Sequence, residues 1–146
     1  MKRHLLLPAL LLSLSTLTWA GEPIGYVKTV SGEASIISEG KTIKAEVGMP
    51  VDAGAVIKTG KDGSLGISFR DNTLMSMGPK TEFAIKDYHY APAEGKLKLS
   101  SKITRGTLDY VSGVIAKLKP EAVTIETPSG VIGVRGTHFM VRVEDE

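Results

Sequence analysis

The chain has 146 residues, and it carries 18 Lys and Arg residues, 16 Asp and Glu residues and no cysteine. The lack of cysteine excludes a disulfide framework and thiolate chemistry. Lys2 and Arg3 account for the excess of basic residues, so residues 21–146 are formally neutral and have no global field that concentrates nucleic acid or an anionic membrane.

The first 20 residues have the order of a secretory signal peptide. A basic start is followed by an apolar run from Leu5 to Leu17, and Thr18 and Ala20 then place small residues at positions −3 and −1 of a cut before Gly21. The apolar run is shorter than the roughly 20 residues that a transmembrane helix needs. We therefore predict cleavage between Ala20 and Gly21, a periplasmic or secreted location, and no transmembrane segment in the mature chain.

Residues 21–146 are enough for one domain with its own core. All 16 glycines lie in this part of the chain, where they separate short apolar runs. Apolar and polar side chains alternate in residues 64–70, 82–86, 96–103 and 138–143, as they do in strands with one buried face. The nearest approach to a helical pattern lies in residues 112–119. We predict an all-β fold of many short strands, arranged as a sandwich or as a coiled, solenoid-like stack, with no substantial helix.

Residues that could support catalysis or bind a metal are scarce in this part. His89 and His138 are its two histidines, whereas a zinc site needs four ligands at compatible spacing. No G-x-S-x-G elbow is present, and Asp62 and Asp71 stand in turns, where Asp is favoured for its local hydrogen bonds. The sequence therefore predicts a protein that is not an enzyme and has no cofactor and no metal.

Residues 130–137 are rich in glycine. A phosphate-binding loop would continue into Lys-Ser or Lys-Thr and the start of a helix, whereas this segment continues into a predicted strand. We interpret Gly130, Gly133 and Gly136 as residues that permit tight turns or a close approach between packed strands.

A row of basic residues comprises Lys96, Lys98, Lys102 and Arg105. Such a row is typical of the solvated face of a strand, where it protects a sheet edge from aggregation. The alternative is that the row binds an acidic polymer.

Several segments resemble the FecR-type periplasmic domain. The resemblance begins at residues 25–32 and 56–60, continues through residues 66–73, and is most specific at residues 125–139, which are similar to the family's ending T-P-x-G…V-x-G-T-x-F. It covers residues 24–143, so we expect residues 21–146 to form a single FecR-like domain. The residues that carry the motifs are Thr59, Gly60, Thr127, Pro128, Gly130, Gly133, Gly136, Thr137 and Phe139.

The resemblance implies an all-β domain that acts by protein contact, with another envelope protein as its expected partner. FecR regulators carry this domain behind a transmembrane helix and a cytoplasmic segment that controls a sigma factor, and a further small domain follows it. Here a predicted signal peptide stands in place of the first two, and the sequence stops just after the last predicted strand. The resemblance therefore implies the module and not direct control of a sigma factor.

These observations predict a non-enzymatic module that senses, scaffolds or regulates by contact in the cell envelope. The alternative is a module that binds an envelope polysaccharide or peptidoglycan.

Tyr88 and Tyr90 have the same strand parity beside an expected loop at residues 91–95, so they form the candidate contact surface. The alternative for this pair is that both tyrosines fill the edge of the core.

Overall fold

The computed structural model describes residues 21–135 and 138–145 of the chain. In these residues twelve strands accompany one short helix, so the predicted all-β fold is confirmed. The predicted signal peptide lies outside the described residues, as do Gly136 and Thr137. Among the described residues, no helix is long and apolar enough to cross a membrane.

The strands are numbered in chain order. Their bounds are β1 (Gly25–Ser31), β2 (Ala34–Ser38), β3 (Lys41–Lys44), β4 (Pro50–Val51), β5 (Val56–Thr59), β6 (Ser64–Phe69), β7 (Leu74–Met77), β8 (Glu82–Ala91), β9 (Lys96–Val111), β10 (Val123–Thr127), β11 (Gly130–Gly133) and β12 (His138–Val143). The helix α1 (Val114–Leu118) follows β9, and the short 3₁₀ turns are η1 (Pro92–Glu94) and η2 (Pro120–Ala122).

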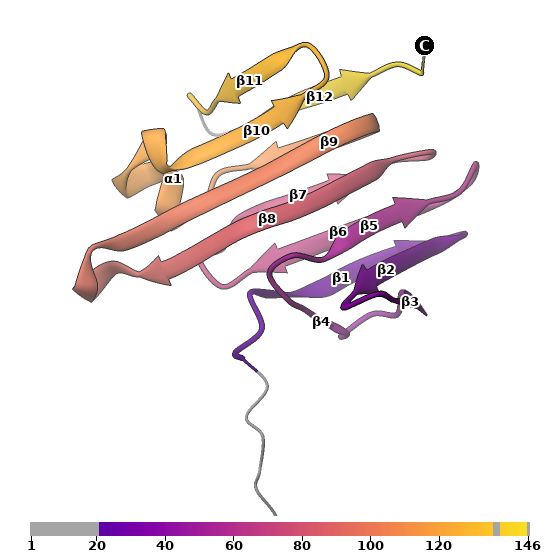
Figure 1. Ribbon diagram of the computed structural model, residues 1–146, viewed down its shortest axis with the longest axis horizontal. Coiled ribbons are helices and arrows are strands. Elements are labelled where there is room, and N and C mark those ends of the chain that lie inside the picture. The colour runs from indigo at the N-terminus through magenta and orange to yellow at the C-terminus, as the bar shows by residue number, and fades with distance from the viewer. Residues whose placement is uncertain (1–20, 136–137, 146) are drawn as a thin grey trace, which may run out of the picture.

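The long strand β9 organises the sheet. Its first part pairs with β8 and β10, and its second part pairs with β7 and β12. One arm of the sheet therefore has the order β3-β2-β5-β8-β9-β10-β11 and the other the order β4-β1-β6-β7-β9-β12. All these pairs are antiparallel except β9–β10, which is parallel. The result is one sheet that curls along β9 into a half-barrel, with two arms that share a core (Figure 1).

Gly106 lies where β9 passes from one arm to the other. Its φ is +95°, and a Cβ atom there would lie between 2.1 and 2.6 Å from atoms of Thr81. The Thr81 hydroxyl fills this space, since it accepts a hydrogen bond from the Thr107 amide at 3.0 Å and donates one to the Gly78 carbonyl at 2.9 Å. Because any side chain at position 106 would displace Thr81, glycine is required at this turn of the sheet.

Two of the family motif residues lie beside this turn. The Thr59 hydroxyl donates to the Gly78 carbonyl at 2.7 Å and accepts from the Thr81 amide at 2.9 Å. Gly60 donates its amide to the Glu33 carbonyl at 2.8 Å, and a Cβ atom at Gly60 would lie 2.7 Å from the Glu33 carboxylate. These contacts tie the turn after β5 to β1–β2 and β7–β8, so both residues have structural roles.

The core follows the alternation that the sequence predicts. In the three runs before residue 104, the predicted inward side chains Leu65, Ile67, Phe69, Phe83, Ile85, Leu99 and Ile103 are buried, and Leu97 is partly buried against the core. In β12, Val141 is buried, and Phe139 and Val143 are partly buried against the core. The register of these strands is therefore as the period-two pattern indicates.

A buried carboxylate joins the two arms. Asp71 lies in the turn after β6 and is 1% exposed. Its carboxylate accepts hydrogen bonds from the Tyr88 hydroxyl at 2.9 Å, the Thr73 hydroxyl at 2.8 Å, the Thr73 amide at 3.3 Å and the Ile115 amide at 3.0 Å. The donors belong to its own turn, to β8 in the opposite arm and to α1. Asp71 thus connects three separate elements in the interior of the protein.

Tyr88 completes this network from the opposite arm. Its ring stacks on Phe69 with 5.5 Å between the ring centroids, and its hydroxyl also accepts the Asp71 amide at 3.0 Å. Burial is the largest cause that raises the pKa of Tyr88 far above its ordinary value of 10, and the nearby charge of Asp71 raises it further. The hydroxyl therefore keeps its proton and remains a donor to the carboxylate.

The Asp71→Asn variant should be less stable than the wild type by about 2–3 kcal/mol, because its amide group places donors where the carboxylate accepts four hydrogen bonds. Urea unfolding followed by circular dichroism measures this difference. The matched control is Asp52→Asn at an exposed position, where we expect a change within about 0.5 kcal/mol. Equal stability of the two variants would show that the Asp71 carboxylate does not hold the arms together.

Candidate functional site

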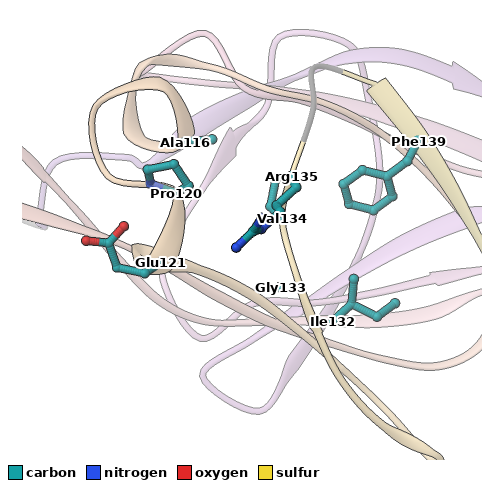
Figure 2. A pocket seen from close by; sticks show the side chains of 8 residues that line it. All are labelled: Ala116, Pro120, Glu121, Ile132, Gly133, Val134, Arg135 and Phe139. Atoms are coloured by element: carbon teal, nitrogen blue, oxygen red, sulfur yellow. The ribbon is translucent and has the colours of Figure 1, made fainter.

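A cleft opens between α1–η2 and the C-terminal strands (Figure 2). Its volume is about 870 Å³. The lining residues are Ala116, Pro120, Glu121, Ile132, Gly133, Val134, Arg135 and Phe139. One wall comes from the segment after β9, and the other from β11, the residues after it, and β12.

The floor of the cleft is apolar and packs against the core of the domain. Phe139 stacks on Tyr110, with 4.9 Å between ring centroids and 28° between ring planes. Tyr110 is fully buried, and this burial is the main cause that raises its pKa. Val134 is also buried, and Ile132 is partly buried against the same core. These contacts fix the apolar floor of the cleft to the interior of the domain.

Two charged residues stand at the exposed rim. Glu121 and Arg135 are both exposed, and in the part of the chain that the structure describes neither forms an ion pair. An apolar floor with single charges at its rim suits the side chains of a protein partner.

Between residues 21 and 135 and from 138 to 145, no group of three or more His, Asp and Glu side chains could hold a metal ion.

A second cleft of about 890 Å³ lies between the β10–β11 turn and the end of β12. Ile132 lines both clefts, and Thr127, Pro128 and Val141 line the second. The Thr127 hydroxyl closes the turn between β10 and β11, since it donates to the Gly130 carbonyl at 3.0 Å and accepts from the Ser129 amide at 3.3 Å. Residues of the β10–β11 hairpin and of β12 thus line both clefts.

Gly130 and Gly133, both predicted to permit a tight turn or a close approach, differ in their backbone conformation and in their surroundings. Gly130 has a φ of +157° in the turn of the hairpin. Gly133 lies in the wall of the first cleft, with no positive φ and with open space where a Cβ atom would be. No backbone constraint therefore requires glycine at position 133, and the prediction of a tight turn or close approach is wrong for this residue. Gly136 and Thr137 lie outside the described residues.

The candidate contact surface of Tyr88 and Tyr90 needs correction. Tyr88 is 6% exposed and its hydroxyl is bound to Asp71, so it belongs to the core and cannot contact a partner. Tyr90 is partly buried and packs against the same core. The prediction of an exposed aromatic face is wrong for Tyr88, because β8 is covered on that face by the opposite arm.

The basic row on β9 is largely paired with acidic residues. Lys96 lies 3.4 Å from Glu94, and Lys98 lies 3.4 Å from Asp87. Arg105 lies 3.7 Å from Glu82, and Lys102 is opposite Glu126 in the β9–β10 ladder. Glu126 is itself bound to Lys86 at 2.7 Å, and Glu82 also lies 3.9 Å from Lys58, so these acids offset the positive charge of the row only in part.

Comparison with known proteins defines the class of the protein. The family model for "FecR protein" matches residues 55–146, and the chain belongs to this family. FecR membership indicates an envelope-associated module of a regulatory class. The match includes α1, β10–β12 and thus the whole first cleft.

A search of solved structures found a likeness to a chain described as a cell surface anchoring domain. The two are 28% identical, with a TM-score of 0.41, and the match covers 42% of this chain and 83% of that one. No curated protein sequence matches this chain.

Sequence reasoning found part of the cleft and missed the rest. Gly133 and Phe139 were among the motif residues, whereas the α1–η2 wall and the rim charges were not singled out. The available signal was the segment of residues 131–134, in which three apolar side chains follow Gly130 and precede Arg135. The opposite wall comes from a short segment without a periodic pattern, so only the fold brings it to the site.

The Phe139→Ala variant should lose about 2–3 kcal/mol of stability, since it removes a partly buried ring that stacks on Tyr110. The neighbouring Met140 side chain is 70% exposed on the opposite face of β12, so Met140→Ala should change stability by less than about 0.5 kcal/mol. Thermal unfolding of both variants measures how much stability the protein loses when an inward or an outward side chain of β12 is removed. Similar losses in both would contradict the orientation of β12.

Proposed function

We propose that this protein is a periplasmic FecR-type module that acts by contact with another envelope protein and has no catalytic activity of its own. The observation that carries the proposal is the open cleft between α1–η2 and β11–β12. Its apolar floor, with Ile132 and Phe139, can accept apolar side chains of a partner. The predicted signal peptide supports delivery of the module to the periplasm.

The chemistry of the cleft supports binding rather than catalysis. Among the described residues that line the cleft, Glu121 is the one carboxylate, and no histidine, serine or threonine accompanies it. General acid–base catalysis and nucleophilic catalysis both need a second positioned group. Glu121 and Arg135 can instead orient a partner by making charge pairs at the rim.

Site-specific photo-crosslinking tests this proposal. A photo-reactive amino acid at Arg135 stands at the rim of the cleft, and the same amino acid at Val131 is the matched control, because Val131 is 64% exposed but does not line the cleft. In cells that export the protein, position 135 should give one discrete adduct with an envelope protein, and position 131 should not. The reason is that only the first probe lies within the proposed interface.

Four outcomes would contradict the proposal. Equal adduct patterns from both positions, or no adduct from position 135, would remove the cleft as the contact site. Retention of the purified protein on isolated peptidoglycan, with binding that weakens steeply as salt is added, would favour the polymer-binding alternative. Substrate turnover by the pure protein would overturn the non-enzymatic assignment.

A further inference from the structure

Strand β12 is an edge of the sheet that lacks the usual protection of an edge. It has six residues, contains neither lysine nor proline, and among the described strands pairs with β9 alone. The other edges of the described sheet are β3, which carries two lysines, β4, which has two residues, and β11, which has four. Because lysine, proline and short length keep an edge from pairing with another chain, β12 is the edge that remains open to a further strand.

The hydrogen bonds of β9 show which backbone groups of β12 are free. The Gly78 amide donates to the Thr107 carbonyl at 3.3 Å, so Thr107 directs this carbonyl to the side of β7. Since the direction alternates along a strand, the next residue of β9 faces its register partner Val141. The residues on either side of Val141, which are Met140 and Arg142, therefore direct their amides and carbonyls to the open edge.

The two clefts form one groove along this open edge. Phe139 lines the first cleft, Val141 and Val143 line the second, and Ile132 lines both. Phe139, Val141 and Val143 are alternate residues of β12 that pack against the core, so this wall of the groove repeats with the period of a strand. A strand added to β12 would lie over the groove, across from β11, with every second side chain pointing into it.

The charges along the groove are balanced. The described residues that line the two clefts include three arginines and three acidic residues, namely Arg105, Arg135, Arg142, Glu121, Glu144 and Asp145. Such a groove has no excess charge that would favour a polyanion. Its apolar wall instead suits an uncharged, apolar side chain at each inward position of the occupant.

We propose that the protein partner supplies an extended segment that adds to the open edge of β12 as a further strand. The alternate side chains of the segment are apolar and enter the groove beside Phe139, Val141 and Val143. Its backbone pairs with Met140 and Arg142, so the backbone hydrogen bonds provide affinity and the groove selects the side chains. This inference rests on the proposed function, because it describes how a protein partner occupies the same cleft.

Proline at the open edge tests the backbone pairing. Met140→Pro removes the amide hydrogen that faces the edge, whereas Met140→Thr removes the same side chain and keeps the amide. Each variant is combined with the photo-reactive amino acid at Arg135 in cells that export the protein. We expect the yield of the adduct to fall about tenfold in Met140→Pro and less than about twofold in Met140→Thr, because only proline removes a strand hydrogen bond.

A second pair of variants repeats the comparison at the next free amide of the edge. Arg142→Pro should lower the adduct yield as Met140→Pro does, and Arg142→Thr is its control. Proline is tolerated in an edge strand where the amide faces solvent, so both proline variants should keep the wild-type circular dichroism spectrum. The comparison uses the variants that keep this spectrum.

N-methylated peptides give a measurement on the wild-type protein. Mass spectrometry of the adduct from position 135 identifies the crosslinked segment of the partner, which is then synthesised as a fluorescent peptide. Methyl groups on alternate amides of one parity should weaken its binding about tenfold, because these amides donate to β12. Methyl groups on the other parity should have little effect. Fluorescence anisotropy measures both affinities.

The outcomes separate this inference from the proposed function. No adduct from position 135 would reject the contact at the cleft and the added strand together. An adduct that persists in the folded proline variants, or equal weakening by methyl groups of both parities, would reject the added strand and leave the contact at the cleft standing. A crosslinked segment without alternating apolar residues would also reject the added strand.

Discussion

The hydrogen bonds to the Asp71 carboxylate are the constraint on which the rest of the structure depends. A carboxylate that is 1% exposed is costly to bury unless donors surround it, and here Tyr88, Thr73 and Ile115 provide them. Removing any donor would leave a buried charge less well compensated. The network therefore fixes the turn after β6, the end of β8 and the start of α1 in one arrangement.

This arrangement also shapes the cleft. The Val114 amide donates to the Asp71 carbonyl at 2.8 Å, and the Ile115 amide donates to its carboxylate at 3.0 Å. The close approach leaves no room at Gly113, where a Cβ atom would lie 2.3 Å from the Thr73 amide nitrogen. Helix α1 is short, so these contacts hold it rather than its own helical stability. Ala116 and Pro120 then form the wall that faces β11–β12.

The sequence predicted the strands well and the site poorly, for a physical reason. Period-two alternation reports which side chains a strand buries, and it placed Leu65, Ile67 and Phe83 correctly in the core. It does not report what lies over a strand, so Tyr88 was predicted as surface although the opposite arm covers it. Asp71 was explained by its turn alone, because its partner Tyr88 is 17 residues away and α1 is farther still. The burial of Tyr88 and the hydrogen bonds of Asp71 both depend on contacts between elements that are far apart in the sequence.

Amide hydrogen exchange of the wild type and the Asp71→Asn variant tests most directly whether the Asp71 network builds the wall of the cleft. The account predicts that exchange in the variant becomes faster at Val114–Leu118 and at the end of β8, whereas β1, β2 and β5 keep their protection. The same protection at α1 in both proteins, or a uniform loss over all strands, would contradict a specific link between the buried carboxylate and the cleft.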